Sequence, residues 1–360
     1  MPAFQIAFVR KSKTDIYRRG KMVNFVFNVI LVFFVWLNRY LVGFPVIFQR
    51  SENLFPFDNL CHIIFITAIY LSLKALSSYM RILFASDIHG NLILLEKLKE
   101  LYKTVNPDIM ILGGDLCPKG FAALTSKGAF WLEVTKNGKI NLPPVNEKVL
   151  MKRKLKEIGI IPVKLSDKEF EDVKNDADAI KRIKIKHQHE FLLNFLDEFK
   201  DMNPYFIFGN DDFKELEGNA IKSKFYINEK ISHLGSIELL GFSYVNTTPF
   251  ENKGWDLSED EISKRLEKFS FDSAFIFVSH APPYNSGLDV VEGKNVGSLA
   301  IRKFIEKHQP LLSLHGHIHE FTGTARIGKT ICVNAGSGHM ENLLKAAVID
   351  TPDKIKFVSL

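Results

Sequence analysis

Five short apolar runs, each followed closely by a residue that can bind a metal ion, constrain this chain more than any other feature. RILFAS leads into Asp87, DIMILGG into Asp115, PYFIFG into Asn210, AFIFVS into His280, and PLLSL into the segment that begins at His315. Runs of this length, rich in Ile, Leu, Val and Phe, are typical of strands buried between helices. In open α/β sheets the loops beyond the carboxyl ends of such strands meet in one crevice. The pattern therefore predicts an α/β domain with one polar cluster.

The polar residues after these runs form a mixed set of nitrogen and oxygen ligands. Asp87 and His89, like His317 and His319, are two positions apart and would project to the same side of an extended chain. Glycines, which permit sharp turns and close backbone approach, stand beside these positions at Gly90, Gly113, Gly114, Gly209 and Gly316. Imidazoles, carboxylates and one amide suit Mn, Fe, Zn, Co or Ni better than Ca.

The order of these motifs resembles the calcineurin-like metallophosphoesterases, whose signature is DxH, GD, GN(H/D), H and GHxH. Here the signature reads D-I-H at 87–89, G-D at 114–115, G-N-D at 209–211, His280 and G-H-I-H at 316–319. NAGSG at 334–338 is similar to the turn before the closing strands of that family. The likeness covers residues 80–360 and is strongest with small uncharacterised phosphoesterases of bacteria and archaea. It implies an α/β fold, a four-layer α/β/β/α sandwich with two sheets face to face and helices outside.

The resemblance also implies a role for each ligand. One divalent ion would be held by Asp87, His89 and His319, the other by Asn210, His280 and His317, and Asp115 would bridge them. Two ions about 3.5–4 Å apart can hold a phosphate and lower the pKa of a bridging water for in-line attack. The expected reaction is hydrolysis of a phosphomonoester or phosphodiester with metal-bridged hydroxide as nucleophile. His315 and Asp212 fall outside the ion pair, and we expect them to support the ligands by packing or hydrogen bonding.

The chain departs from the signature at the residue after Asn210. Most hydrolases of this type carry a histidine there to protonate the leaving group, whereas this chain has Asp211. Asn210 and Asp211 are the catalytic candidates. A carboxylate this close to two cations should have a depressed pKa and be a poor acid, unless burial raises its pKa. We therefore expect a preference for acidic leaving groups, such as aryl phosphates or diesters with a phosphate or nucleotide on the departing side.

The charge balance and the complete ligand set argue against two alternative functions, a nuclease and a non-catalytic scaffold. Residues 1–79 hold nine Lys or Arg against three Asp or Glu, which leaves residues 80–360 with 38 of the chain's 47 bases and 38 of its 41 acids. A neutral domain gives no sign of polyanion binding, so a nuclease is the weaker enzyme reading. A non-catalytic protein-binding scaffold on the same fold would be marked by lost ligands, and all seven are present. The expected substrate is a small phosphate ester or nucleotide-type molecule, and the oligomeric state stays open.

Residues 1–79 differ in composition from the rest. The stretches 22–48 and 60–73 are apolar on every face and follow six bases between positions 10 and 21, which predicts a membrane hairpin with both ends in the cytoplasm. Lys74 ends the second stretch early. The alternative is that the working protein begins at Met80, because MRILFASDIHGN reads as the opening strand of a domain. Three scattered cysteines favour a reducing compartment, hence a cytoplasmic protein, with anchoring through residues 22–79 left open.

Two further segments carry predictions. A long segment between Asp115 and Asn210 predicts an insertion at about 118–200, largely helical, in which S-D-K-E at 166–169 is spaced as a helix-capping box. GTARIGKT at 323–330 matches the phosphate-binding loop GxxxxGK(S/T) letter for letter. That loop needs a helix to open at the Lys, but TICVNAGSG follows, so we expect a second strand after a turn at Gly328–Lys329.

Overall fold

A computed structural model of the chain describes residues 80–134, 140–141, 152–157, 159–250, 252–351 and 353–360. The predicted membrane hairpin, and with it the question of whether the working protein begins at Met80, concerns residues 1–79 and lies outside these ranges. Within the described ranges, no helix combines the length and the apolar character that crossing a bilayer requires.

The first sheet has five strands in the order β19-β18-β1-β2-β7. They are β1 (Arg81–Ala85), β2 (Ile109–Gly113), β7 (Tyr205–Ile207), β18 (Lys345–Asp350) and β19 (Lys354–Ser359). β1, β2 and β7 run parallel, while β18 and β19 run antiparallel to their neighbours. Helix α3 (Leu92–Val105) connects β1 to β2, and the Asn91 side chain caps it by accepting hydrogen bonds from two backbone amides. The carboxyl ends of β1, β2 and β7 therefore lie at one edge of the sheet.

The second sheet has six strands in the order β16-β17-β15-β12-β9-β8. They are β8 (Ile231–Leu234), β9 (Ile237–Phe242), β12 (Phe275–Ser279), β15 (Leu312–His315), β16 (Gly323–Ile327) and β17 (Thr330–Asn334). The four inner strands run parallel. All five apolar runs predicted to precede ligands therefore form parallel strands, three in the first sheet and two in the second. β16 and β17 form an antiparallel hairpin that turns at Gly328–Lys329. The prediction of a strand here, rather than a phosphate-binding loop and helix, is confirmed.

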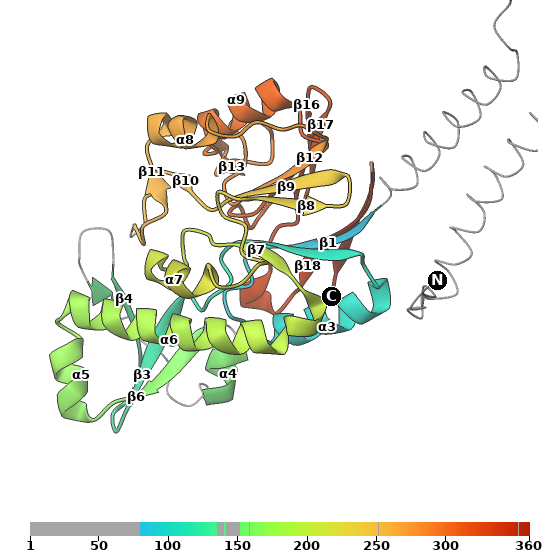
Figure 1. The fold of residues 1–360 in the computed structure, drawn as a ribbon. Helices are drawn as coiled ribbons and strands as arrows, with labels where there is room; N and C mark the ends of the chain where they lie inside the picture. The colour runs from blue at the N-terminus through green and yellow to red at the C-terminus, as the bar shows by residue number, and fades with distance from the viewer. Residues whose placement is uncertain (1–79, 135–139, 142–151, 158, 251, 352) are drawn as a thin grey trace, which may run out of the picture. The chain divides into compact units, whose positions relative to one another are not determined.

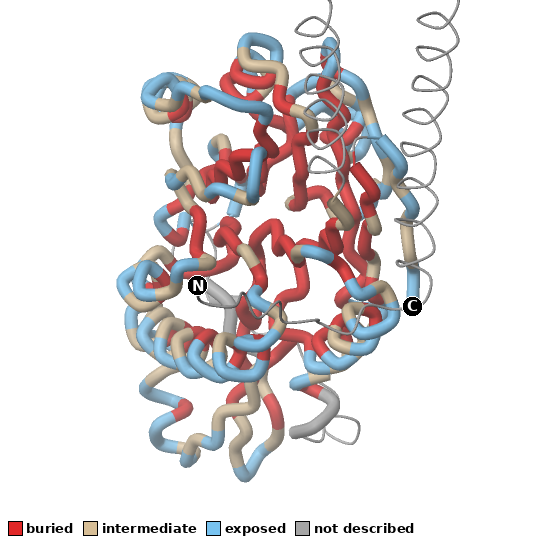
Figure 2. The backbone as a smooth tube through the Cα atoms, turned by 45° about the vertical axis from the view of Figure 1, so that its right-hand side comes forward, coloured by how far each residue is buried: buried red, intermediate tan, exposed pale blue. Residues whose placement is uncertain are grey.

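Successive side chains of a strand point to opposite faces of its sheet, so each sheet has one apolar face that packs against the other sheet. Ile82 and Phe84 of β1 face the second sheet in a core of Ile, Val and Leu, whereas Leu83 and Ala85 pack in the larger cluster that includes α3. Helices α8 (Glu259–Leu266) and α9 (Leu299–His308) lie outside the six-stranded sheet, and α3 lies outside the five-stranded sheet (Figure 1). Figure 2 shows buried backbone, in red, through the interior of the body, in agreement with the complete burial of β9 and β12. The predicted α/β/β/α sandwich is confirmed.

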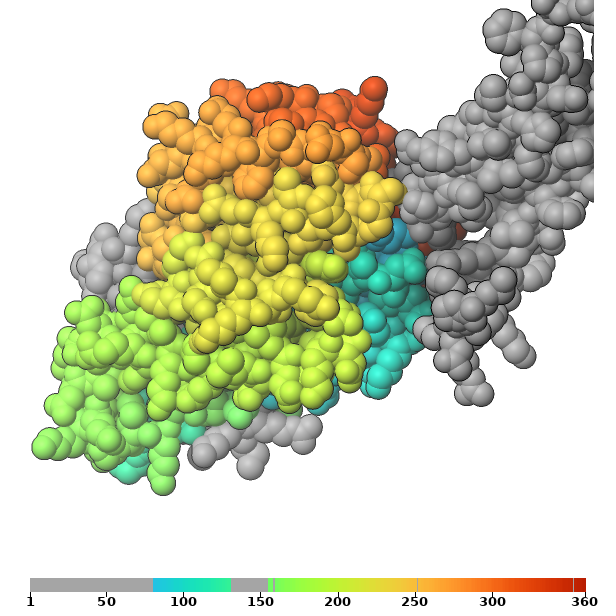
Figure 3. Space-filling view, viewed as in Figure 1, coloured from blue at the N-terminus to red at the C-terminus, as the bar shows by residue number. Residues whose placement is uncertain are grey.

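The insertion contains the predicted helices and, in addition, a small sheet that the sequence patterns did not indicate. Helices α4 (Lys152–Glu157), α5 (Asp167–Val173) and α6 (Ala177–Glu198) accompany strands in the order β5-β4-β3-β6. The strands are β3 (Gly120–Thr125), β4 (Gly128–Val134), β5 (Ile140–Asn141) and β6 (Ile160–Lys164). Ser166 and Glu169 form the capping box at the start of α5. In Figure 3 the insertion, coloured green, forms a lobe beside the two-sheet body.

Short elements complete the described chain. They are η1 (Lys200–Met202), η2 (Lys214–Leu216), α7 (Glu217–Ala220), β10 (Val245–Asn246), β11 (Asp256–Leu257), β13 (Val290–Val291), β14 (Lys294–Asn295) and η3 (His339–Glu341).

Candidate metal centre

The loops after β1, β2 and β15 carry ligand residues with left-handed backbone conformations. The φ angles are 56° at Asp87, 48° at His89, 49° at Asp115 and 69° at His317. Non-glycine residues seldom adopt this region, and strain of this kind is concentrated at functional sites. Backbone hydrogen bonds hold the first two loops together, from the Asp87 amide to Gly114 O at 3.0 Å and from the His89 amide to Asp115 O at 2.9 Å.

One group of four predicted ligands converges on a single point. His319 Nε2 lies 3.3 Å from both His89 Nε2 and Asp87 Oδ1, and His89 Nε2 lies 3.8 Å from Asp115 Oδ2. One ligand atom from each of the four residues falls within 4.8 Å of the other three. Bonds of about 2.0–2.2 Å from one cation to nitrogen and oxygen atoms require separations of this order.

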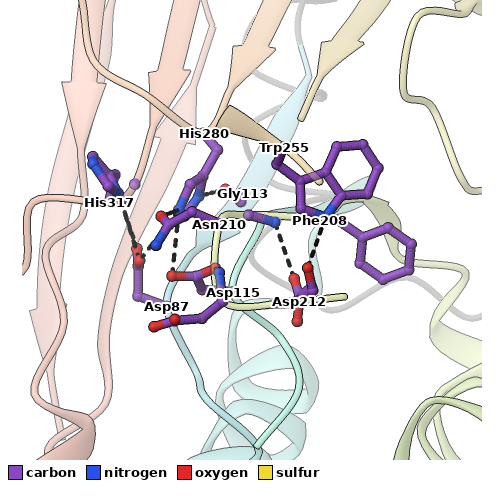
Figure 4. A network of polar contacts seen from close by, with 12 residues as sticks. Asp87, Gly113, Asp115, Phe208, Asn210, Asp212, Trp255, His280 and His317 are labelled. Carbon is purple, nitrogen blue, oxygen red and sulfur yellow. Dashed lines mark hydrogen bonds and ion pairs between the residues drawn. The ribbon is translucent and has the colours of Figure 1, made fainter. Parts of the chain in front are cut away.

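A second group forms around His280. Its Nε2 lies 3.1 Å from Asn210 Oδ1 and 3.4 Å from Asp115 Oδ2, and its ring packs at 5.2 Å, centroid to centroid, against that of His317. Its Nδ1 lies 2.8 Å from Gly113 O, and an Nδ1–H donated to this carbonyl aims Nε2 at the carboxylates (Figure 4). Asp115 is thus within reach of both histidine groups, as a bridging ligand must be.

The electrostatics of the cluster fit a cation site. Burial lowers the pKa of His89 to about 3 and that of His317 to about 4, so both rings are neutral at pH 7 with a lone pair to offer. Burial opposes a charge on His280, but Asp115 and Asp87 outweigh it and raise its pKa to about 10 in the metal-free protein. Burial would raise the pKa of Asp87, yet the surrounding histidines lower it far below its usual range. The protonated His280 supplies the positive charge that a bound cation would replace.

Asp212 and His315 lie behind the cluster. Asp212 accepts hydrogen bonds from the backbone amides of Cys117 (2.8 Å), Gly209 (3.0 Å) and Leu116 (3.2 Å), so it ties the loop after β2 to the loop after β7. The Trp255 indole donates to Asp212 O at 2.7 Å. His315 lies on β15 with its ring buried and its Nδ1 3.0 Å from Ser279 Oγ.

Asp211, the residue in place of the family's histidine, lies between two lysines. Lys253 Nζ is 2.5 Å from its Oδ1 and Lys119 Nζ is 3.2 Å from its Oδ2, while His89 Nδ1 is 3.8 Å from Oδ2. Burial would raise the pKa of Asp211, but Lys253, Lys119 and His89 together lower it well below the usual range. Asp211 is therefore ionised at neutral pH and carries no proton to donate.

Sequence reasoning did not anticipate three of these neighbours. Lys119 and Lys253 belong to no motif and reach Asp211 only through the path of their loops. His339 is buried, and its ring lies 4.2 Å from that of His89 and 5.0 Å from that of His319, centroid to centroid. The available signal for His339 was its place directly after NAGSG at 334–338.

Comparison with known proteins agrees with these motifs. The family model of the calcineurin-like phosphoesterases matches residues 80–163. An uncharacterized protein of Methanocaldococcus jannaschii is 37% identical over 132 residues, which are 35% of this chain and 60% of that protein's length. The resemblance that the motifs carry is thereby confirmed, and the family match covers the part of the chain that holds the first two motifs, D-I-H at 87–89 and G-D at 114–115.

Solved structures show similarity over most of the chain. A Thermus thermophilus protein is 17% identical with a TM-score of 0.48, covering 78% of this chain and 98% of its own. A structure described as a dimetal phosphatase from Danio rerio is 9% identical with a TM-score of 0.45, covering 78% and 95% respectively.

Proposed function

We propose that the protein is a dinuclear-metal-dependent hydrolase of phosphate esters. One ion would be held by Asp87, His89 and His319, the second by Asn210, His280 and His317, with Asp115 shared between them. The observation that carries this proposal is the convergence of side chains from five strand ends around Asp115, whose Oδ2 lies 3.8 Å from His89 Nε2 and 3.4 Å from His280 Nε2. The nitrogen and oxygen donor set supports Mn, Fe, Zn, Co or Ni as the ions.

When bound, two such ions supply a polarised phosphate and a water of lowered pKa. The chain's own residues fix the orientation of the ligand side chains. The His280–Gly113 hydrogen bond fixes the histidine's direction, and the Asp211 amide donates to Asp115 Oδ1 at 2.7 Å, which fixes the shared carboxylate. Asp212 holds the two loops that carry these residues. Lys119, partly exposed at the rim, adds positive charge where a phosphate ester would approach.

The ionised state of Asp211 supports the predicted substrate preference. A hydrolase in which the residue at the histidine position holds no proton works best on leaving groups that depart as stable anions. The proposed substrates are therefore small aryl or nucleotide-type phosphate esters. Cytoplasmic action is part of the proposal, supported by the free, buried thiols of Cys117 and Cys332.

The test is a metal titration with two chromogenic substrates, p-nitrophenyl phosphate and bis-p-nitrophenyl phosphate. We expect metal-dependent release of p-nitrophenol from at least one of them, loss of that activity in His280→Gln, and full activity in His233→Gln, whose side chain is 72% exposed on β8. Two bound ions without hydrolysis of either substrate would favour the scaffold alternative.

A further inference from the structure

His339 belongs to none of the ligand positions implied by the family signature, yet it lies against them. It begins η3 (His339–Glu341) and is 6% exposed. Asn91 Nδ2 donates to His339 O at 2.7 Å, and the same asparagine caps the helix that follows the His89 loop. The backbone of His339 is therefore fixed to the loop that carries Asp87 and His89.

The ring of His339 completes a three-histidine group. One ring nitrogen each of His89, His319 and His339 fall within 4.8 Å of one another. Bonds of about 2.1 Å from a cation to nitrogen allow separations of up to about 4.2 Å, so only a small movement would bring all three onto one ion.

Ser337 fixes which nitrogen of His339 is available. Its hydroxyl donates to Asp87 O at 2.7 Å, so the oxygen can accept a hydrogen bond from His339 Nδ1, which lies 3.3 Å away. A proton on Nδ1 leaves Nε2 with its lone pair. One serine thereby orients the His339 ring and holds the backbone of Asp87.

We propose that His339 is an additional protein ligand of the ion held by Asp87, His89 and His319. The inference rests on the dinuclear site proposed above. That ion would then be surrounded by three imidazoles and two carboxylates, and the other by two imidazoles, one amide and the shared carboxylate. Extra nitrogen ligation favours Zn, Ni or Co over Mn at the first position, and it leaves fewer places there for water or phosphate.

The experiment uses metal-free full-length protein titrated with Zn(II) by calorimetry, with the bound metal measured by elemental analysis. Wild type is compared with His339→Ala, His339→Gln and the matched control His233→Ala. Loss of a residue that merely supports a ligand costs about 10- to 100-fold in metal affinity. Removing His339 should therefore lower the affinity for one of the two ions at least about tenfold. The other ion and the control should not change.

A second readout separates ligation from packing. With Co(II) in place of Zn(II), the visible absorption reports the ligands directly, and both His339 variants should shift it. Ser337→Ala should weaken the same ion by a smaller factor, because the ring loses its orienting partner. A purely structural role predicts a lower melting temperature with neither ion selectively weakened.

The outcomes are distinct. Two ions of unchanged affinity and an unchanged Co(II) spectrum in the His339 variants would overturn this inference and leave the dinuclear site standing. Wild type that binds no ion would overturn the dinuclear site, and the ligation by His339 with it.

Discussion

Gly209 offers the sharpest test of the site geometry, because a single added methyl group would enter the cluster. A Cβ built on Gly209 would lie 2.5 Å from His280 Nε2 and closer still to Asp115 Oδ1. Ordinary contact between such atoms needs about 3.5 Å, so these two side chains must move by about 1 Å. A displacement of about 1 Å in a catalytic group can lower activity roughly 100-fold. Overpacking of this kind costs about 1–3 kcal/mol of stability.

The assay compares Gly209→Ala with Gly218→Ala, a helical glycine of α7 whose added Cβ would meet nothing within 4 Å. We expect Gly209→Ala to lower kcat/KM on bis-p-nitrophenyl phosphate roughly 100-fold and the free energy of unfolding in urea by about 1–3 kcal/mol. Gly218→Ala should keep full activity, and its free energy of unfolding should rise by about 0.5–1 kcal/mol. A Gly209→Ala protein that binds its full complement of metal and stays within about threefold of wild type would refute this geometry, since the loss expected from a 1 Å shift is far larger.

Three other predictions concern protons and packing. Asp211→His should raise turnover of alkyl phosphates, whose leaving groups need a proton, while aryl phosphates change little; equal rates would mean that another residue is the acid. Metal uptake should release the proton of His280, because the pKa of that histidine is about 10 in the metal-free protein. Calorimetric binding enthalpies should therefore depend on the buffer, and metal affinity should rise about tenfold per pH unit from pH 7 to 9. A pH-independent affinity would contradict this. Trp255→Phe should cost about 1–3 kcal/mol in urea unfolding, because the buried Asp212 carbonyl loses its donor, and an unchanged midpoint would contradict that role.

The raised pKa of His280 also gives a stability profile for the metal-free protein. A group whose pKa is higher in the folded state stabilises fully below its unfolded pKa, here 6.5, and loses that contribution as pH rises towards about 10. The stabilisation gained on adding metal should therefore grow between pH 7 and 9, as measured by the melting temperature with and without Zn(II).

Much of the two-sheet body could be predicted because burial on both faces leaves a clear sequence pattern. Continuous apolar runs marked the parallel strands, and their carboxyl ends located the ligand loops. The β-branched run of β17 indicated a hairpin after Gly328–Lys329 despite the phosphate-loop match. Local signals also sufficed for α5, whose capping box is formed by side chains three positions apart.

The insertion sheet and the outer members of the site could not be predicted, because they depend on contacts made after folding. β3 reads G-F-A-A-L-T, with two small alanines, and owes its strand conformation to pairing with β4 and β6. Lys253 lies 42 positions from Asp211, and no strand periodicity links them. Spacing along the chain specifies only those ligands that stand directly at strand ends.

The order in which the ligands occur along the chain bears on biosynthesis. Asp87 is synthesised before its partner His319, and β1 is synthesised before its antiparallel neighbour β18. Contacts between such distant segments form late in folding. The nascent polypeptide accordingly has no complete set of proposed ligands until the segment that carries His319 has been synthesised, 230 positions after His89.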